Sequence, residues 1–227
     1  MVKATNKEEE VLVTRTPSIP ELTGNSLFPG ISYVTRDKRW GCKRWLGKKL
    51  YASFLNTLCN LASRTNAKRV IDVGCGDAVP LIHLWLGLQL EEAVGIDTDP
   101  QVLRVAERNL PEAHFVVGSI YDIPTHGRNF DLVVCSEVLE HLEAPQRALA
   151  ALASLKSSFF LISCPNEPLY RLSLLLRGKY VGRWGSSPGH VNHWSPGALV
   201  KLASEHLQIV EARLAGLSTV LLATPKG

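Results

Sequence analysis

Two glycines and an acid in this chain are spaced so that they could hold a nucleotide-like ligand. Gly74 and Gly76 follow the apolar run 70–73, with one residue between them. Glycines in such a loop let a ligand approach the backbone closely. Asp97 comes 21 residues after Gly76, about the distance at which open α/β sheets place a carboxylate on a ribose. The dinucleotide pattern G-x-G-x-x-G is not completed, because Val79 stands where its third glycine would be.

A second group of ionisable residues lies further along the chain. Glu137, Glu140 and His141 are spaced i, i+3 and i+4, so on a helix they would share one face. Two carboxylates and an imidazole could hold Mg²⁺, Mn²⁺ or Zn²⁺, with His190 or His193 as a further ligand. The alternative is a helix start with solvated acids and a histidine bonded to the backbone. We favour this second interpretation and expect no metal.

The elements that must position these residues alternate between strand and helix. Strands are predicted near 69–73, 93–97, 114–118, 131–136, 159–164, 208–214 and 218–224, and helices near 43–63, 79–89, 100–109, 143–155 and 196–207. This alternation indicates right-handed βαβ units and a parallel sheet. The last two strands have no helical pattern between them, so we expect an antiparallel hairpin there. The long connection at 166–194 contains a short amphipathic helix and lies where ligands bind in open α/β sheets.

Four motifs in this order resemble those of class I S-adenosylmethionine (SAM)-dependent methyltransferases. The run Arg69-Val-Ile-Asp-Val-Gly-Cys-Gly-Asp-Ala78 resembles motif I, with Ala78 in place of its last glycine. Asp97 ends a second strand, as in the family. The segments 115–124 and 130–142 resemble the adenine-contacting segment and the fourth strand with its following helix. The resemblance covers roughly residues 68–165 and points to the type 11 or ubiquinone-biosynthesis-like methyltransferases.

The resemblance implies a Rossmann-like, doubly wound α/β fold. Its seven-stranded sheet would be mainly parallel and end in an antiparallel hairpin. We expect an N-terminal arm at 1–42 and one methyltransferase domain at 43–227, with residues 166–194 as a lid over the methyl acceptor. The cofactor would be S-adenosyl-L-methionine, bound by Asp72, Gly74, Cys75, Gly76, Asp97, Thr98, Ser119 and Ile120. Glu137, His141 and His193 are the candidate catalytic residues.

Charge and composition narrow the expected partners. The 227 residues carry a net charge of +4, but basic residues interleaved with aromatic ones concentrate at 36–49 and 167–205. This pattern suggests an anionic partner, although a solvated face with inward-packed aromatic residues is equally compatible. We expect O-methylation of a small molecule that is anionic or lipid-like. A nucleic-acid methyltransferase is the second choice, and a non-catalytic SAM-binding module the third.

The location of the protein is predicted from three absences in the sequence. There is no apolar run of the roughly 20 residues that span a bilayer, and no apolar signal segment at the start. The five cysteines show no C-x-x-C pairing, and their odd number fits a reducing compartment. We therefore expect a cytoplasmic protein without a transmembrane segment.

Overall fold

The computed structural model describes residues 45–227 apart from 126, 186 and 188, so the expected arm at 1–42 lies outside the described residues. The chain forms a seven-stranded sheet of order β3-β2-β1-β4-β5-β7-β6. Its strands are β1 Arg69–Val73, β2 Glu92–Asp97, β3 His114–Val117, β4 Phe130–Ser136, β5 Ser157–Pro165, β6 Leu207–Ala215 and β7 Ser218–Pro225. Strands β1 to β5 pair in parallel, and β7 pairs antiparallel with both β5 and β6.

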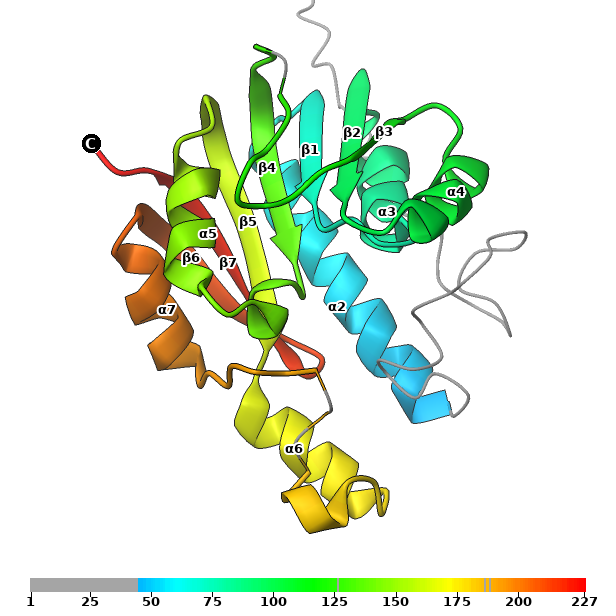
Figure 1. Ribbon diagram of the computed structural model, residues 1–227, viewed down its shortest axis with the longest axis vertical. Helices are drawn as coiled ribbons and strands as arrows, with labels where there is room; N and C mark the ends of the chain where they lie inside the picture. The colour runs from blue at the N-terminus through cyan, green and yellow to red at the C-terminus, as the bar shows by residue number, and fades with distance from the viewer. Residues whose placement is uncertain (1–44, 126, 186, 188) are drawn as a thin grey trace, which may run out of the picture.

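Helices cover both faces of this sheet (Figure 1). The described helices are α2 Trp45–Ser63, α3 Val79–Leu88, α4 Pro100–Asn109, α5 Pro145–Ala153, α6 Glu167–Leu176 and α7 Pro196–Ser204, with 3-10 turns η1 Leu139–His141 and η2 Val181–Arg183. All of these α-helices except α6 pack on a face of the sheet. The predicted doubly wound fold, with its mainly parallel sheet and terminal hairpin, is confirmed.

The two faces of the sheet are separated by strand alternation. In β1, Val70 packs in a core formed with α2, α3 and α4, while Ile71 packs in the opposite core with α5 and α7. Successive side chains of a strand point to opposite faces, so a continuous apolar run is what a strand buried on both sides requires. Asp99 caps α4 by accepting a hydrogen bond from the backbone N–H of Gln101 at 2.8 Å, and Pro100 takes the first helical position.

The carboxyl ends of the parallel strands meet at one edge, and α6 lies beyond this edge (Figure 1). The segment 166–194 leaves the sheet after β5 and returns to the point where it left. Asn166 and Trp194 form an isolated parallel bridge, and Glu167 N–H donates to the Trp194 carbonyl at 3.2 Å. In the described part of the chain, no helix has the length and apolar character that crossing a membrane requires.

Candidate active site

A cavity of about 270 Å³ lies at the carboxyl ends of the parallel strands. This volume is close to the lower end of ligand pockets, about 300–1,000 Å³. Its lining comes from the loops after β1, β2, β3 and β4, and consists of Gly74, Asp97, Thr98, Gly118, Ser119, Ile120, Tyr121, Glu137, Val138, His141 and Leu142. The structure thus brings together seven of the eleven residues predicted from sequence: Gly74, Asp97, Thr98, Ser119, Ile120, Glu137 and His141.

Asp97 ends β2 and joins the strand to the glycine loop. Its Oδ2 accepts a hydrogen bond from Gly76 N–H at 2.9 Å, and its Oδ1 accepts one from Asp99 N–H at 3.0 Å. Each carboxylate oxygen has a second lone pair, so both can still accept a bond from a ligand hydroxyl. Asp97 therefore positions the loop as well as offering a binding group.

The glycine loop has left-handed backbone where the sequence places its small residues. Gly74 has φ +81°, and a Cβ there would come within 2.4 Å of Val138 Cγ2. Gly76 has φ +56°, with open space where its Cβ would be. Ala78 has φ +63° although it is not glycine. The last glycine of motif I is therefore replaced here by alanine at a position whose left-handed backbone strains an L-residue.

Asp72 lies beneath this loop with 1% of its surface exposed. Within the described residues, neither of its carboxylate oxygens has a hydrogen-bond partner. Burial raises the pKa of Asp72 to about 7, and the nearby negative charge of Asp97 acts in the same direction. A buried carboxyl without a partner fits a cationic ligand group placed next to it.

The remaining loop residues differ in what they can offer a ligand. The Cys75 side chain is buried, and burial raises the pKa of its thiol well above the usual range. Only its backbone is available, and its N–H already donates to the Ile96 carbonyl at 3.0 Å. Ser119 Oγ accepts a hydrogen bond from Tyr121 N–H at 3.2 Å. Asp72, Cys75 and Gly76 adjoin the cavity lining without forming part of it.

The prediction that Glu137, Glu140 and His141 share one face of a helix is wrong. Glu137 has φ +59°, which ends the regular backbone of β4, and residues Leu139–His141 form a single 3-10 turn. Glu137, Glu140 and His141 therefore do not share one face of an α-helix. Glu137 is 6% exposed and its Oε1 accepts a hydrogen bond from Ser163 Oγ at 3.1 Å. A left-handed non-glycine residue is uncommon and concentrates at functional sites.

His141 reaches the cavity from the same turn. Its Nδ1 lies 2.8 Å from the Gly189 carbonyl oxygen, so Nδ1–H donates and Nε2 carries the lone pair of the neutral ring. Nε2 lies 3.6 Å from Glu140 Oε1. About a third of the His141 side chain is exposed, which leaves the ring accessible from the cavity.

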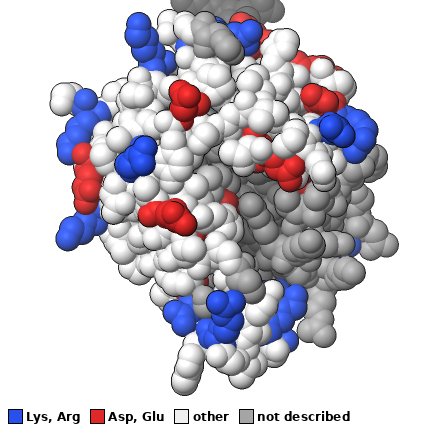
Figure 2. Space-filling model, viewed as in Figure 1, with Lys and Arg blue, Asp and Glu red and all other residues white. Residues whose placement is uncertain are grey.

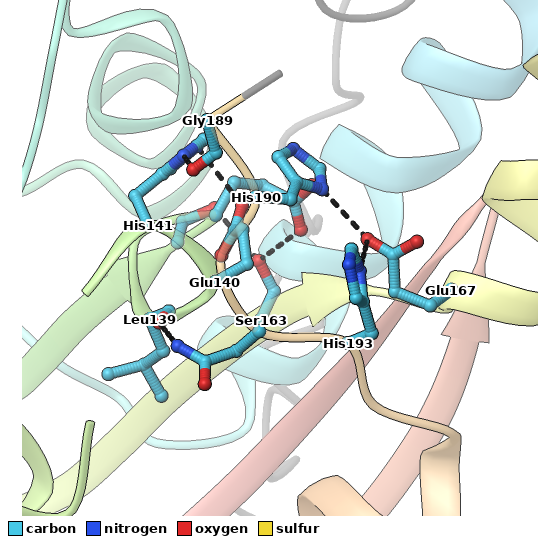
Figure 3. A network of polar contacts seen from close by, with 11 residues as sticks. Leu139, Glu140, His141, Ser163, Glu167, Gly189, His190 and His193 are labelled. Carbon is cyan, nitrogen blue, oxygen red and sulfur yellow. Dashed lines mark hydrogen bonds and ion pairs between the residues drawn. The ribbon is translucent and has the colours of Figure 1, made fainter. Parts of the chain in front are cut away.

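His193 does not line this cavity. It lines a second cavity of about 430 Å³, together with Glu167, Pro168, Arg171, Leu172, Leu175, Trp184, Trp194 and Ser195. His190 connects the two regions, because its ring packs edge-on against His141 with centroids 4.9 Å apart. Glu167 Oε1 lies 2.7 Å from His190 Nδ1 and 3.3 Å from His193 Nδ1 (Figure 3).

Among the residues that the structure describes, two triads have the donor types of a metal site. Glu140, His141 and His190 form one, and Glu167, His190 and His193 form the other, with donor atoms within 4.8 Å of one another in each. Glu137 belongs to neither triad, so the predicted alternative of Glu137, Glu140 and His141 as joint ligands is not the grouping that the fold produces.

Sequence reasoning missed several residues of the site. Gly118, Tyr121, Val138 and Leu142 line the first cavity. Tyr121 falls within the segment 115–124 that resembles the adenine-contacting segment, and this position was a usable signal. Glu167 gave no signal, because its partners lie 23 or more residues further along the chain.

Comparison with known proteins shows what this chain is similar to. Residues 71–156 match a family model described as a methyltransferase domain. The ubiquinone biosynthesis O-methyltransferase of Azoarcus sp. (strain BH72) is 33% identical over 102 residues, which cover 43% of this chain and 41% of that protein. The alignments cover 24% to 57% of the lengths of the curated relatives compared.

Solved structures share the fold at low sequence identity. The small RNA methyltransferase HEN1 has a TM-score of 0.64 at 19% identity, covering 78% of this chain and 25% of that one. The N-methyltransferase NodS from Bradyrhizobium japonicum WM9, in complex with S-adenosyl-l-homocysteine, has a TM-score of 0.61 at 16% identity. It covers 78% of this chain and 88% of that one.

Proposed function

We propose that this chain, which belongs to the class I S-adenosylmethionine-dependent methyltransferases, transfers the methyl group of SAM to an oxygen atom of a small-molecule acceptor. One observation carries the proposal. A single cavity is lined by Gly74 and Asp97, which suit the donor, and by Glu137 and His141, which suit an acceptor. Positioning two reactants side by side is the main task of an enzyme that uses an already activated donor.

The residues around the glycine loop fit SAM as the donor. SAM is cationic at its sulfonium and its amino group, and the buried Asp72 carboxyl has no partner among the described residues. Asp97 can accept hydrogen bonds from the two ribose hydroxyls. The space beside Gly76 would be filled by a Cβ at that position, which supports close approach of the donor to the backbone. Ser119 and Ile120 line the cavity where the adenine would lie.

SAM supplies a methyl group whose carbon–sulfur bond breaks, with the electron pair passing to sulfur, as the acceptor oxygen bonds to the methyl carbon. The chain must then remove the proton of the acceptor hydroxyl. Nε2 of His141 carries the lone pair in the neutral ring, and we assign it this proton. The Glu137 carboxylate, held by Ser163, would orient the acceptor. His193 would contact the acceptor from the segment 166–194, the expected lid.

An anionic or lipid-like acceptor is supported by the second cavity and its surroundings. Leu172, Leu175 and Trp184 give this cavity an apolar wall, and Arg171 adds a positive charge. Figure 2 shows Lys and Arg side chains gathered at the end of the molecule where Figure 1 places α6. Trp184 is 78% exposed and Leu176 is 80% exposed on the same segment. Apolar and basic side chains together suit an amphipathic anion.

The same basic side chains favour a nucleic-acid acceptor as the second candidate. Arg171, Arg177, Lys179 and Arg183 lie between Glu167 and Glu205, and no acid occurs between these two. Phosphate contacts by such residues make binding steeply dependent on salt. A small acceptor that is bound mainly by apolar contacts would show a much weaker dependence.

The test uses SAM with a labelled methyl group and three separate acceptor pools: a lipid extract, a polar metabolite extract and total RNA. We expect label in a small anionic or lipid-like compound, attached as a methoxy group. Label confined to RNA, with transfer that falls steeply as salt is raised, would replace the proposal by the second candidate.

A further inference from the structure

One carboxylate oxygen of Glu167 contacts two histidines, His190 and His193, near the end of the segment 166–194. Glu167 is the first residue of α6 and is 3% exposed. Its Oε1 lies 2.7 Å from His190 Nδ1 and 3.3 Å from His193 Nδ1 (Figure 3). The hydrogen bond from Glu167 N–H to the Trp194 carbonyl ties the backbone beside the carboxylate to the backbone beside these rings. This backbone hydrogen bond between the start and the end of the segment 166–194 therefore keeps the three side chains close together.

The protonation of both rings follows from these partners. An ionised carboxylate can only accept hydrogen bonds, so each Nδ1 that contacts it must carry the proton. A separation of 2.7 Å is that of a charge-assisted N–H···O bond. In the neutral ring the lone pair then lies on the other nitrogen, Nε2. His141 follows the same pattern, because its Nδ1–H donates to the Gly189 carbonyl. All three histidines thus present Nε2 as their basic atom.

Packing fixes the orientation of the His190 ring. The ring stacks on Tyr170 with centroids 5.3 Å apart and an interplanar angle of 16°. Its other neighbour is the edge of the His141 ring. The backbone that follows is bonded to the turn η1, since Val191 N–H and Asn192 N–H both donate to the Glu140 carbonyl, at 2.9 and 3.1 Å. His190 and His193 are therefore held against the turn that carries His141.

We infer that Glu167 is a positioning residue of the acceptor site, which fixes His190 and His193 as Nδ1–H tautomers so that their Nε2 atoms can interact with the acceptor. This inference rests on the proposed methyl transfer. Carboxylates that hold a functional histidine from behind set its tautomer and its ring orientation, and their loss commonly costs about 10- to 100-fold in activity or affinity at metal sites. Glu167 acts through the histidines and does not itself contact the reacting atoms.

The first test needs no variant and no substrate. ¹⁵N NMR of the wild-type protein labelled at histidine, at about pH 8 where exposed histidines are neutral, distinguishes protonated from unprotonated ring nitrogens. His190→Asn and His193→Asn identify the signals. We expect protonated Nδ1 and unprotonated Nε2 at both residues. A proton on Nε2 of His190 would overturn the inference.

The second test uses Glu167→Gln, with Glu205→Gln at the exposed end of α7 as the matched control. In Glu167→Gln we expect the His190 and His193 signals to move toward a mixture of tautomers. We also expect kcat to fall about tenfold or more while KM for SAM changes less than about twofold. Unchanged histidine signals, or an unchanged kcat, would contradict the positioning role. An absence of any turnover in the wild type would instead contradict the proposed function. The two failures are distinguishable, because the NMR measurement of the tautomers does not require turnover.

Discussion

Asp97 Oδ2 accepts a hydrogen bond from the backbone N–H of Gly76 at 2.9 Å, which couples the end of β2 to the glycine loop after β1. Asp97, which we propose binds the ribose of the donor, therefore also supports the glycine loop. A change at Asp97 affects both contacts, so its effect on donor binding should exceed the loss of the ribose contact alone.

Asp97→Ala is predicted to weaken SAM binding by at least about 1.5–3 kcal/mol, the range for a hydrogen bond to a charged group. Isothermal titration calorimetry measures this difference. Asp99→Ala is the control: it removes the cap of α4 and about 1 kcal/mol of stability, but leaves the donor contacts in place. Equal affinity of wild type and Asp97→Ala would show that the ribose site is misplaced, and binding of NADH in place of SAM would overturn the assignment of the donor.

Gly74→Ala is predicted to destabilise the protein by about 2–4 kcal/mol, because it combines left-handed backbone strain with overpacking against Val138. Gly127→Ala is the matched control, since Gly127 has φ +78° but nothing within 4 Å of its added Cβ. This control should lose only about 1–2 kcal/mol. Urea unfolding compares the two variants, and equal losses would mean that the contact with Val138 is unimportant.

Asp72 should make SAM binding depend on pH. The donor's positive charge favours the ionised carboxylate, and the pKa of Asp72 in the free protein is about 7. Binding below this pH must therefore release a proton, so affinity should fall by up to about tenfold for each pH unit below about 7. Calorimetry between about pH 5.5 and about pH 7 tests this, and Asp72→Asn should flatten the dependence. A wild-type dependence that persists in Asp72→Asn would assign it to another group.

The same shift has a consequence for the stability of the donor-free protein. The pKa of Asp72 is raised from 3.8 to about 7, so the folded state holds a proton that the unfolded state has released. The free energy of unfolding should therefore fall as pH rises from about 4 to about 7, by up to about 4 kcal/mol from this residue. The difference between wild type and Asp72→Asn, followed by urea unfolding across this window, isolates the contribution.

Methyl transfer is predicted to survive exhaustive chelation, because the proposed base is Nε2 of His141. Turnover is measured with chelator and then with Mg²⁺, Mn²⁺ or Zn²⁺ restored. Activity that vanishes with chelator and returns with one ion would contradict this. It would make Glu140, His141 and His190 the candidate ligands, since their donor atoms lie within 4.8 Å of one another.

The sequence predicted the sheet well because strand and helix patterns are local. The predicted strand at 69–73 matches β1 residue for residue, and the others agree within two residues at each end. Most residues that line the first cavity were also predictable, since parallel strands bring their carboxyl ends to one edge. Gly74 and Glu137 each follow a strand and Asp97 ends one, so their shared cavity is a consequence of topology.

The surroundings of Glu137, His141 and Glu167 were less predictable, for two physical reasons. The spacing of Glu137 and His141 suggested a helix, but φ +59° at Glu137 is a local backbone choice that the spacing does not reveal. The contact of Glu167 with His190 depends on the path of the segment between them, which the sequence pattern does not specify. Tertiary position, and not residue type, decides which histidine meets which carboxylate.

The most direct measurement is methyl transfer by wild type, Glu137→Gln and His141→Asn with the acceptor identified from the labelled extracts. We predict that all three proteins bind SAM with similar affinity and that only the wild type transfers the methyl group efficiently, with kcat of each variant lower by about 10²-fold or more. Full activity in both variants, or donor binding without transfer to any acceptor by the wild type, would contradict the account.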